Sequence, residues 1–307
     1  MERLPLMIPR MLEKGDRVGV ISPSGPVHES ELEQGLDMLK SSGYEVVLGS
    51  GVYLRHGYMA GEDGLRLADF HDMFADPEIK AVFCSRGGYG AMRLLRNIDY
   101  ELVRNNPKLF IGYSDITALH MALHLRTGLV SFHGPVVRGF HENKGANFKK
   151  MIEVVSNPQP QPLSLKMGSV LAAGKAKGPL MGGNLSVICS LLGTPYLPSF
   201  KGSVFFMEDR GEQPYRVDRM LTQLLMSGKI DDISCLLLGE FRECGEDEAI
   251  ADLMKERLAG LGIPVIKGLP VGHGANNLAL PIGVNVEIDS SSMALSFIQK
   301  PVSNRPD

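Results

Sequence analysis

The alternation of short apolar runs with amphipathic segments in the first half of the chain constrains the fold most strongly. The runs RVGVISP (17–23), IKAVFCS (79–85) and KLFIGYS (108–114) are typical of strands that are buried on both faces. The amphipathic segments 29–43 and 64–76 predict helices that connect parallel strands by right-handed crossovers. The sequence therefore predicts an α/β fold with a doubly wound parallel sheet.

A break in this pattern predicts a second, smaller domain. The segment NPQPQPLSLKMG (157–168) carries three prolines and few apolar anchors, so we expect it to link an N-terminal α/β domain (1–156) to a C-terminal domain (169–307). The second part contains the glycine-rich segment GPLMGGNL (178–185), which we expect to form a turn. Its last apolar runs, such as VNVEID (284–289), lack helical partners and predict a mixed α+β domain with antiparallel pairing.

Charge and hydropathy exclude several classes of partner. The chain has 32 basic and 35 acidic residues with no basic stripe, so we expect no binding to nucleic acid. No run approaches the roughly 20 apolar residues of a membrane span, and charges near the start interrupt any signal-peptide pattern. We therefore expect a cytoplasmic protein without a membrane partner. The sequence allows a homodimer and does not determine the oligomeric state.

The cysteines predict neither a disulfide framework nor a zinc site. They lie far apart in apolar or mixed contexts and show no CxxC spacing, so we expect buried, reduced thiols. They are Cys84, Cys189, Cys235 and Cys244.

A strand that runs directly into a helix gives the sharpest chemical signal. In LFIGYSDITALHMAL (109–123), Ser114 and Asp115 stand between the apolar run and the helix. Such a turn exposes a serine hydroxyl above the sheet edge, beside the free N–H groups of the helix start. The pattern G-x-S-x-G is half met, because Ile116 replaces the second glycine. Either Ser114 is a nucleophile or one of Ser114 and Asp115 caps the helix.

A glycine turn follows an earlier strand, in CSRGGYGAMRLL (84–95), before a predicted helix over 91–98. The N–H groups at Gly87 and Gly88 could donate to an oxyanion, and a purely structural turn is the alternative. The dinucleotide pattern G-x-G-x-x-G is absent, so we expect no nucleotide cofactor and disfavour a Rossmann-type oxidoreductase.

An acid and a histidine complete a candidate catalytic set. The apolar run GSVFFMED ends at Glu208 and Asp209, where an α/β fold displays catalytic groups, although either carboxylate could instead form a surface ion pair with a nearby arginine. His273 stands between two glycines on a loop and is the best candidate base. Ser114, Glu208 and His273 thus supply a nucleophile, an orienting acid and a base.

A second pair of histidines has metal-like spacing. His120 and His124 stand four residues apart on one helix, but the glutamate of H-E-x-x-H is missing. We expect these side chains to pack along the helix and predict no metal site.

Several long motifs in one order resemble the LD-carboxypeptidase family of serine peptidases, family S66. They are GDRVGVISPSGP, CSRGGYGAMRLL, IGYSDITAL, GPLMGGNLSVICSLLGTP, FMEDRGEQPYRVDRML and GHGANNLALPIG. The resemblance implies that Ser114 is the nucleophile, Glu208 the triad acid and His273 the base. It also implies an active site between two domains and removal of terminal D-alanine from murein tetrapeptides, usually after meso-diaminopimelate, in cell-wall recycling.

On this reading, other residues receive roles as hypotheses. The backbone N–H groups of Gly88 and Asp115 would form the oxyanion hole. Arg86 would bind the free carboxylate of the peptide, with an ion pair as the alternative. Asn184 of GGNL would line the same cleft, a role supported only by the family-like context.

Two other functions stay open. The microcin-immunity branch of the same family cleaves peptidyl nucleotide antibiotics and often stacks the base on tryptophan; this chain has no tryptophan, which favours a murein peptide. The other alternative is a non-catalytic module that binds a peptide or nucleotide.

Overall fold

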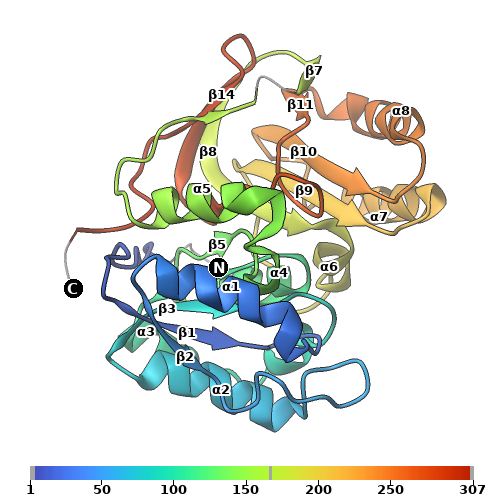
Figure 1. The fold of residues 1–307 in the computed structure, drawn as a ribbon. Coiled ribbons are helices and arrows are strands. Elements are labelled where there is room, and N and C mark those ends of the chain that lie inside the picture. The colour runs from blue at the N-terminus through green and yellow to red at the C-terminus, as the bar shows by residue number, and fades with distance from the viewer. Residues whose placement is uncertain (1–3, 166–167, 305–307) are drawn as a thin grey trace.

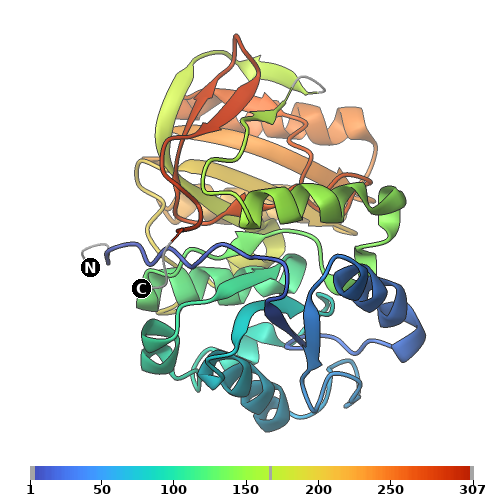
Figure 2. The same ribbon diagram turned by 60° about the vertical axis from the view of Figure 1, so that its left-hand side comes forward.

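The computed structural model describes residues 4–165 and 168–304, which form two β-sheets. In Figure 1 the N-terminal sheet and its helices, in blue to green, lie below the C-terminal sheet, in yellow to red. Figure 2 shows α5, the green helix, lying between the two sheets. The N-terminal and C-terminal segments lie side by side, since Met11 N donates to Ser303 O at 2.9 Å.

The first sheet is the predicted doubly wound parallel sheet. Its strands follow the order β12-β5-β4-β3-β1-β2, in which β1 to β5 are parallel to their neighbours and β12 pairs antiparallel with β5. The bounds are β1 Arg17–Ile21, β2 Glu45–Leu48, β3 Ile79–Cys84, β4 Leu109–Gly112, β5 Phe132–His133 and β12 Leu280–Pro281.

Helices cover both faces of this sheet, as the unbroken apolar runs require. Strand side chains on opposite faces of the sheet belong to different apolar clusters. Phe83 packs with Phe140 on one face, and Phe110 packs with Phe70 on the other. The helices are α1 Glu29–Ser41 and α5 Ala146–Val155 on the first face, and α2 Asp63–Ala75, α3 Tyr100–Asn105 and α4 Thr117–Thr127 on the second.

The second sheet has a parallel centre and antiparallel edges. Its order is β6-β14-β13-β8-β9-β10-β11-β7, in which β8 to β11 are parallel. Its strands are β6 Leu163–Ser164, β7 Ser169–Ala172, β8 Lys175–Asn184, β9 Val204–Arg210, β10 Cys235–Arg242, β11 Val265–Lys267, β13 Asn285–Asp289 and β14 Ala294–Phe297. Its helices are α6 Leu185–Ser190, α7 Pro214–Met226 and α8 Asp247–Leu258.

Two local predictions are wrong. The segment 178–185 is no turn, because β8 continues to Asn184; a Cβ on Gly182 would lie 1.9 Å from Phe206 O, so this glycine allows β8 to approach β9. The predicted helix over 91–98 is a single 3-10 turn, η1 Ala91–Leu94. The Asp99 side chain accepts from Leu102 N and starts α3 as a separate helix.

The predicted linker is partly built into the second sheet. Within 157–168, β6 pairs with β14, and residues 166–167 lie outside the described residues. The chain also returns from the second sheet to the first at β12. The division at 157–168 stays a prediction.

The remaining short helices are 3-10 turns: η2 Ser114–Ile116, η3 Val137–Gly139, η4 Glu142–Gly145 and η5 Ala259–Leu261. All four cysteines are buried and free. Within 4–165 and 168–304, no helix is long and apolar enough to cross a membrane.

Candidate active site

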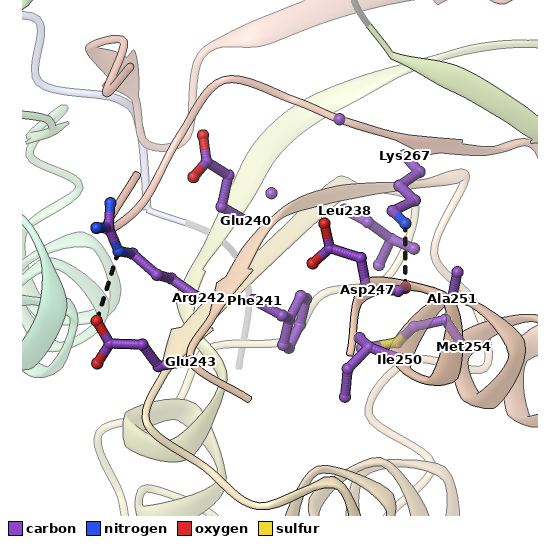
Figure 3. Close-up of a pocket in the computed structure, with 12 residues that line it drawn as sticks. Leu238, Glu240, Phe241, Arg242, Glu243, Asp247, Ile250, Ala251, Met254 and Lys267 are labelled. Carbon is purple, nitrogen blue, oxygen red and sulfur yellow. Dashed lines mark hydrogen bonds and ion pairs between the residues drawn. The ribbon is translucent and has the colours of Figure 1, made fainter. Parts of the chain in front are cut away.

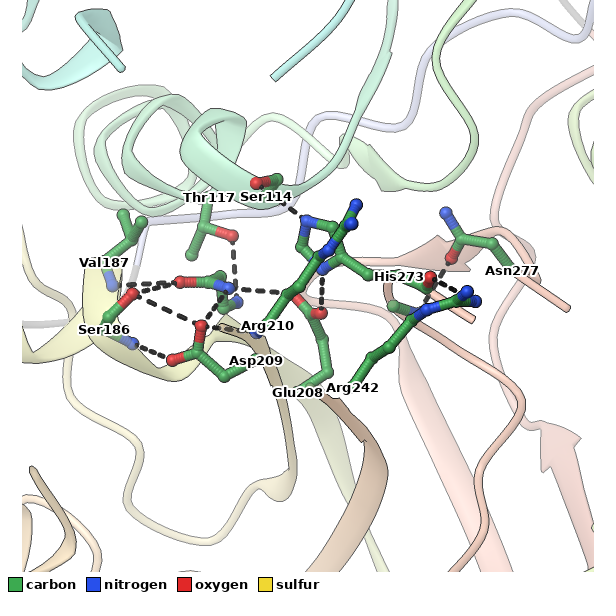
Figure 4. Close-up of polar contacts among 12 residues, drawn as sticks. Ser114, Thr117, Ser186, Val187, Glu208, Asp209, Arg210, Arg242, His273 and Asn277 are labelled. Carbon is green, nitrogen blue, oxygen red and sulfur yellow. Dashed lines mark hydrogen bonds and ion pairs between the residues drawn. The ribbon is translucent and has the colours of Figure 1, made fainter. Parts of the chain in front are cut away.

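Three side chains from separate strand ends meet between the two sheets. Ser114 follows β4, Glu208 lies near the end of β9, and His273 lies on the loop after β11. Ser114 Oγ lies 3.1 Å from His273 Nε2, and Glu208 Oε2 lies 2.7 Å from His273 Nδ1 (Figure 4). A carboxylate only accepts, so Nδ1 carries the proton and Nε2 is free to accept the Ser114 hydroxyl. The structure thus brings together the three residues that the sequence selected.

The backbone around Glu208 and His273 permits this close contact. Glu208 is fully buried, and its Oε1 accepts from Asn184 Nδ2 at 3.3 Å. Gly272 has a φ of +114°, and a Cβ there would lie 2.6 Å from Glu208 Oε2. A side chain at this position would therefore push the carboxylate away from the imidazole.

Ser114 lies in a sharp turn with an unusual backbone conformation. Its φ is 66°, in the left-handed region that non-glycine residues rarely occupy, and such strain often marks functional sites. A Cβ on Gly87 would lie 2.8 Å from Ser114 Cβ, so the glycine turn passes directly beside the serine. The Tyr113 ring lies 4.9 Å from the His273 ring, and burial raises the pKa of Tyr113 to about 12.

Asp115 fixes the turn from behind. Its Oδ2 accepts from Ser24 Oγ at 2.6 Å and from Ala91 N at 2.8 Å. Burial raises its pKa, and these donors oppose the shift. No side-chain cap bond is present at the start of η2 or of α4. Asp115 therefore connects the segments that follow β1, β3 and β4. The helix-cap alternative did not predict these contacts.

The glycine turn borders the same space. Gly88 has a φ of +121° and lines a pocket of about 290 Å³ together with Ser114, Asp115 and His273. Its N–H donates to no other residue in the described part of the chain. The position suits a donor to an oxyanion that forms beside Ser114.

Three arginines line this pocket together with Asp115 and Asp209. Arg86 lines it, donates from Nη1 to Pro26 O at 2.9 Å, and has a buried Nε without a hydrogen-bond partner. Burial lowers the Arg86 pKa, and the nearby Arg138 lowers it further. Arg138 and Arg210 also line the pocket. The sequence analysis selected neither as a site residue. Arg210 could have been found because it directly follows the two acids at the end of a predicted strand, whereas no sequence pattern marks Arg138.

Asn184 and Asp209 lie beside Glu208, the candidate acid. Asn184 lines the pocket, and its Nδ2 also donates to Asp209 Oδ1 at 3.0 Å. Asp209 accepts from the backbone N–H groups of Ser186 and Arg210. Burial, followed by the neighbouring Glu208, raises the Asp209 pKa to about 6. Among the described residues, neither acid forms an ion pair with an arginine, which excludes the surface ion-pair alternative there.

The second pair of histidines lies within the packing of the first sheet. His120 is fully buried, with Nε2 2.8 Å from Gly112 O and Nδ1 2.8 Å from Ser131 Oγ, and burial lowers its pKa to about 4. His124 lies on the next turn of α4. In the ranges that the structure covers, no group of three His, Cys, Asp or Glu side chains could hold a metal ion.

Comparisons with known proteins all indicate the same family. Residues 18–134 match the model of the LD-carboxypeptidase N-terminal domain, and residues 177–288 match that of the C-terminal domain. The chain is 40% identical over 294 residues to a probable murein peptide carboxypeptidase of Bacillus subtilis, which covers 92% of each chain. It is 34% identical to a murein tetrapeptide carboxypeptidase of Pseudomonas aeruginosa, over 90% of this chain and 94% of the relative.

A solved structure shares nearly the whole fold. This is the structure of MccF in complex with glutamyl sulfamoyl guanosine, which matches with a TM-score of 0.91 and 26% identity over 97% of this chain and all of the other. The microcin C7 self-immunity protein MccF of Escherichia coli is also 26% identical over 329 residues, covering 95% of this chain and 96% of the relative.

Proposed function

Because the chain belongs to the LD-carboxypeptidase family, peptidase family S66, we propose that it is a serine carboxypeptidase that removes terminal D-alanine from murein tetrapeptides. The Bacillus relative is a probable murein peptide carboxypeptidase and the Pseudomonas relative a murein tetrapeptide carboxypeptidase, which supports this substrate. Cleavage of the L,D bond before D-alanine would serve cell-wall recycling.

In the proposed mechanism His273 activates Ser114. Nε2 takes the hydroxyl proton as Oγ forms a bond to the scissile carbonyl carbon. Glu208 holds the imidazole in the required tautomer and stabilises its charged form. The C–N bond then breaks, and the proton on Nε2 passes to the departing amine of D-alanine. Water, deprotonated by the same imidazole, hydrolyses the acyl-enzyme and restores Ser114.

The oxyanion that forms in each step would lie against the N–H groups of Gly88 and Asp115. Both residues line the pocket beside Ser114, and the helical start that includes Asp115 favours negative charge. Loss of one such donor costs about 3 to 4 kcal/mol of transition-state stabilisation in other hydrolases.

An exopeptidase must also hold the free carboxylate of its substrate. Arg86 has a guanidinium nitrogen without a partner and lies next to the glycine turn, so it is our candidate for this contact. Arg138 and Arg210 line the same pocket, but each is paired with a glutamate, Glu31 and Glu243 respectively.

The single observation that carries the proposal is the row of contacts from Ser114 through His273 to Glu208, at 3.1 and 2.7 Å. The test is release of D-alanine from a defined murein tetrapeptide by the wild type and by Ser114→Ala. Release by the wild type alone supports the proposal. No release by the wild type, or equal release by both proteins, rejects it.

A second candidate is hydrolysis of peptidyl nucleotide antibiotics, which the similarity to MccF favours. The absence of tryptophan from the sequence is our reason to place it second. Comparing turnover of the tetrapeptide with that of an aminoacyl sulfamoyl adenosine separates the two activities. A non-catalytic binding module would turn over neither compound.

A further inference from the structure

The Glu208 carboxylate is fully buried, so each of its oxygens needs a hydrogen-bond donor. Oε2 lies 2.7 Å from His273 Nδ1, and Oε1 accepts from Asn184 Nδ2 at 3.3 Å. Among the described residues, no other group donates to this carboxylate. The orientation of the Asn184 amide therefore decides whether Oε1 has a donor.

Within the described chain, the neighbouring strand β10 offers no donor in place of Asn184. Gly239 of β10 lies against Glu208, since a Cβ there would lie 2.9 Å from Glu208 Cβ. The charged side chains that follow line another pocket, of about 360 Å³, and Arg242 Nε lies 3.6 Å from Glu243 Oε1 there (Figure 3). Glu208 therefore depends on Asn184 for its second donor.

Contacts on both sides of the Asn184 amide fix its orientation (Figure 4). Nδ2 donates to Asp209 Oδ1 at 3.0 Å as well as to Glu208, so its two hydrogens serve two carboxylates. On the other side, Oδ1 accepts from Ser186 Oγ at 2.7 Å and from Val187 N at 3.2 Å. A rotated amide would place its carbonyl oxygen against both carboxylates, which would repel it.

Asp209 is held in place by backbone donors. It is buried, and its carboxylate accepts from Ser186 N and Arg210 N, both at 2.8 Å. Burial, followed by the adjacent Glu208, raises the Asp209 pKa to about 6, so the group is an ionised acceptor above this value. A second buried acid beside Glu208 is electrostatically unfavourable, and a neutral side chain would avoid the repulsion. The carboxylate at this position therefore calls for a reason.

We propose that Asp209 is a positioning residue of the triad: its carboxylate fixes the Asn184 amide, and the amide holds Glu208 against His273. The proposal rests on the proposed peptidase function and adds a residue to its machinery. Asp209 acts through Asn184 and does not need to touch the substrate.

The test is a double-mutant cycle of Asp209→Asn and Asn184→Ala. Asp209→Asn keeps the size of the side chain but removes an oxygen that accepts. Each single variant should lower kcat for D-alanine release about tenfold and change KM little, because Glu208 is displaced while the binding pocket is kept. The double variant should lose no more than Asn184→Ala alone, since Asp209 acts through that amide.

Two control variants separate this effect from a general loss of structure. Asp232→Asn makes the same chemical change at an exposed position, where Asp232 pairs with Lys201. Ile188→Ala removes buried apolar contacts of α6 and leaves the amide and both carboxylates. At equal folded fraction, both controls should keep the kcat of the wild type.

Proton NMR supplies a readout that a purely structural role would not change. The His273 Nδ1 proton, bound to Glu208, should give a low-field signal in the wild type and in Ile188→Ala. Asp209→Asn and Asn184→Ala should move this signal to higher field, because the Glu208 carboxylate is no longer held against the imidazole. The measurement needs no substrate.

Four results would overturn the proposal. Additive losses of kcat in the double variant would mean that Asp209 acts independently of Asn184. The other three are an unchanged kcat in Asp209→Asn, an unmoved signal in that variant, and the absence of a low-field signal from the wild type. Failure of the peptidase function gives a different pattern, since no protein would release D-alanine while the NMR signal would still respond to Asp209→Asn.

Discussion

Asn184 donates its backbone N–H to Thr117 Oγ1 at 3.0 Å, and this bond joins the two halves of the site. Thr117 begins α4, directly after the turn that carries Ser114, and Asn184 ends β8 and binds Glu208. Gly183 has a φ of +151°, and a Cβ there would lie 2.6 Å from Thr117 Oγ1. The turn of Ser114 and the strand end of Glu208 are therefore held in register by a contact that only glycine allows.

Gly183→Ala should separate the two halves and lower kcat/KM about 100-fold, because small displacements of catalytic groups have effects of this size. Gly193→Ala is the matched control: its φ is +80°, but no heavy atom lies within 4 Å of the added Cβ. It shares the backbone strain without the collision. D-alanine release at equal folded fraction measures both variants. Equal losses of kcat/KM would mean that backbone strain, and not the collision with Thr117, lowers the activity.

Arg86→Ala should raise KM for the tetrapeptide about tenfold or more and change kcat little, since the lost contact is to the free carboxylate. A tetrapeptide that ends in D-alaninamide provides the control substrate. The wild type should prefer the acid over the amide, and Arg86→Ala should lose this preference. An unchanged kcat/KM for the acid would reject the role of Arg86.

Glu208→Gln should lower kcat about 10⁴-fold with little change in KM, because the imidazole loses the carboxylate that fixes its tautomer. Glu212→Gln is the control, as Glu212 pairs with Arg216 on the surface and not with His273. Steady-state kinetics of D-alanine release measure both variants. A loss of less than tenfold in Glu208→Gln would remove the acid from the mechanism.

His120 should make the protein sensitive to acid. Its pKa is lowered to about 4 in the fold, below the ordinary value of 6.5, so the unfolded chain binds more protons between these values. The free energy of unfolding should therefore fall as the pH drops through this window, by about 3 kcal/mol from this group. His120→Gln can still donate to Gly112 O but does not titrate.

Urea unfolding at about pH 7.5 and about pH 4.5 checks this prediction. The wild type should lose more stability between the two values than His120→Gln. Equal losses in the two proteins would mean that His120 is not kept neutral by the fold.

The sequence predicts the first sheet well, because each face of a buried parallel strand needs apolar side chains and the resulting run is visible directly. Phe83 and Phe110 illustrate this, since they pack on opposite faces within unbroken apolar runs. The β8 strand is not visible in this way. Its glycines have the pattern of a turn in the sequence. Only the structure shows that Gly182 lacks a side chain because the backbone of β9 lies too close.

The site could be predicted only where a strand end carries a reactive group. Ser114, Glu208 and His273 have that signal, and the structure brings them together. The contact of Thr117 with Asn184 joins segments far apart in sequence, and both residue types are common at surfaces. Such pairs become visible only when the two sheets are placed against each other.

Labelling with a fluorophosphonate tests the central claim most directly, because the probe reacts with a serine whose hydroxyl is activated by a base. Ser114 and His273 are 159 positions apart, and their 3.1 Å contact is the basis of the account. Mass spectrometry should find the adduct on Ser114 in the wild type, and labelling should be lost in His273→Ala at equal folded fraction. An unlabelled wild-type Ser114, or labelling at the same rate without His273, would contradict the account.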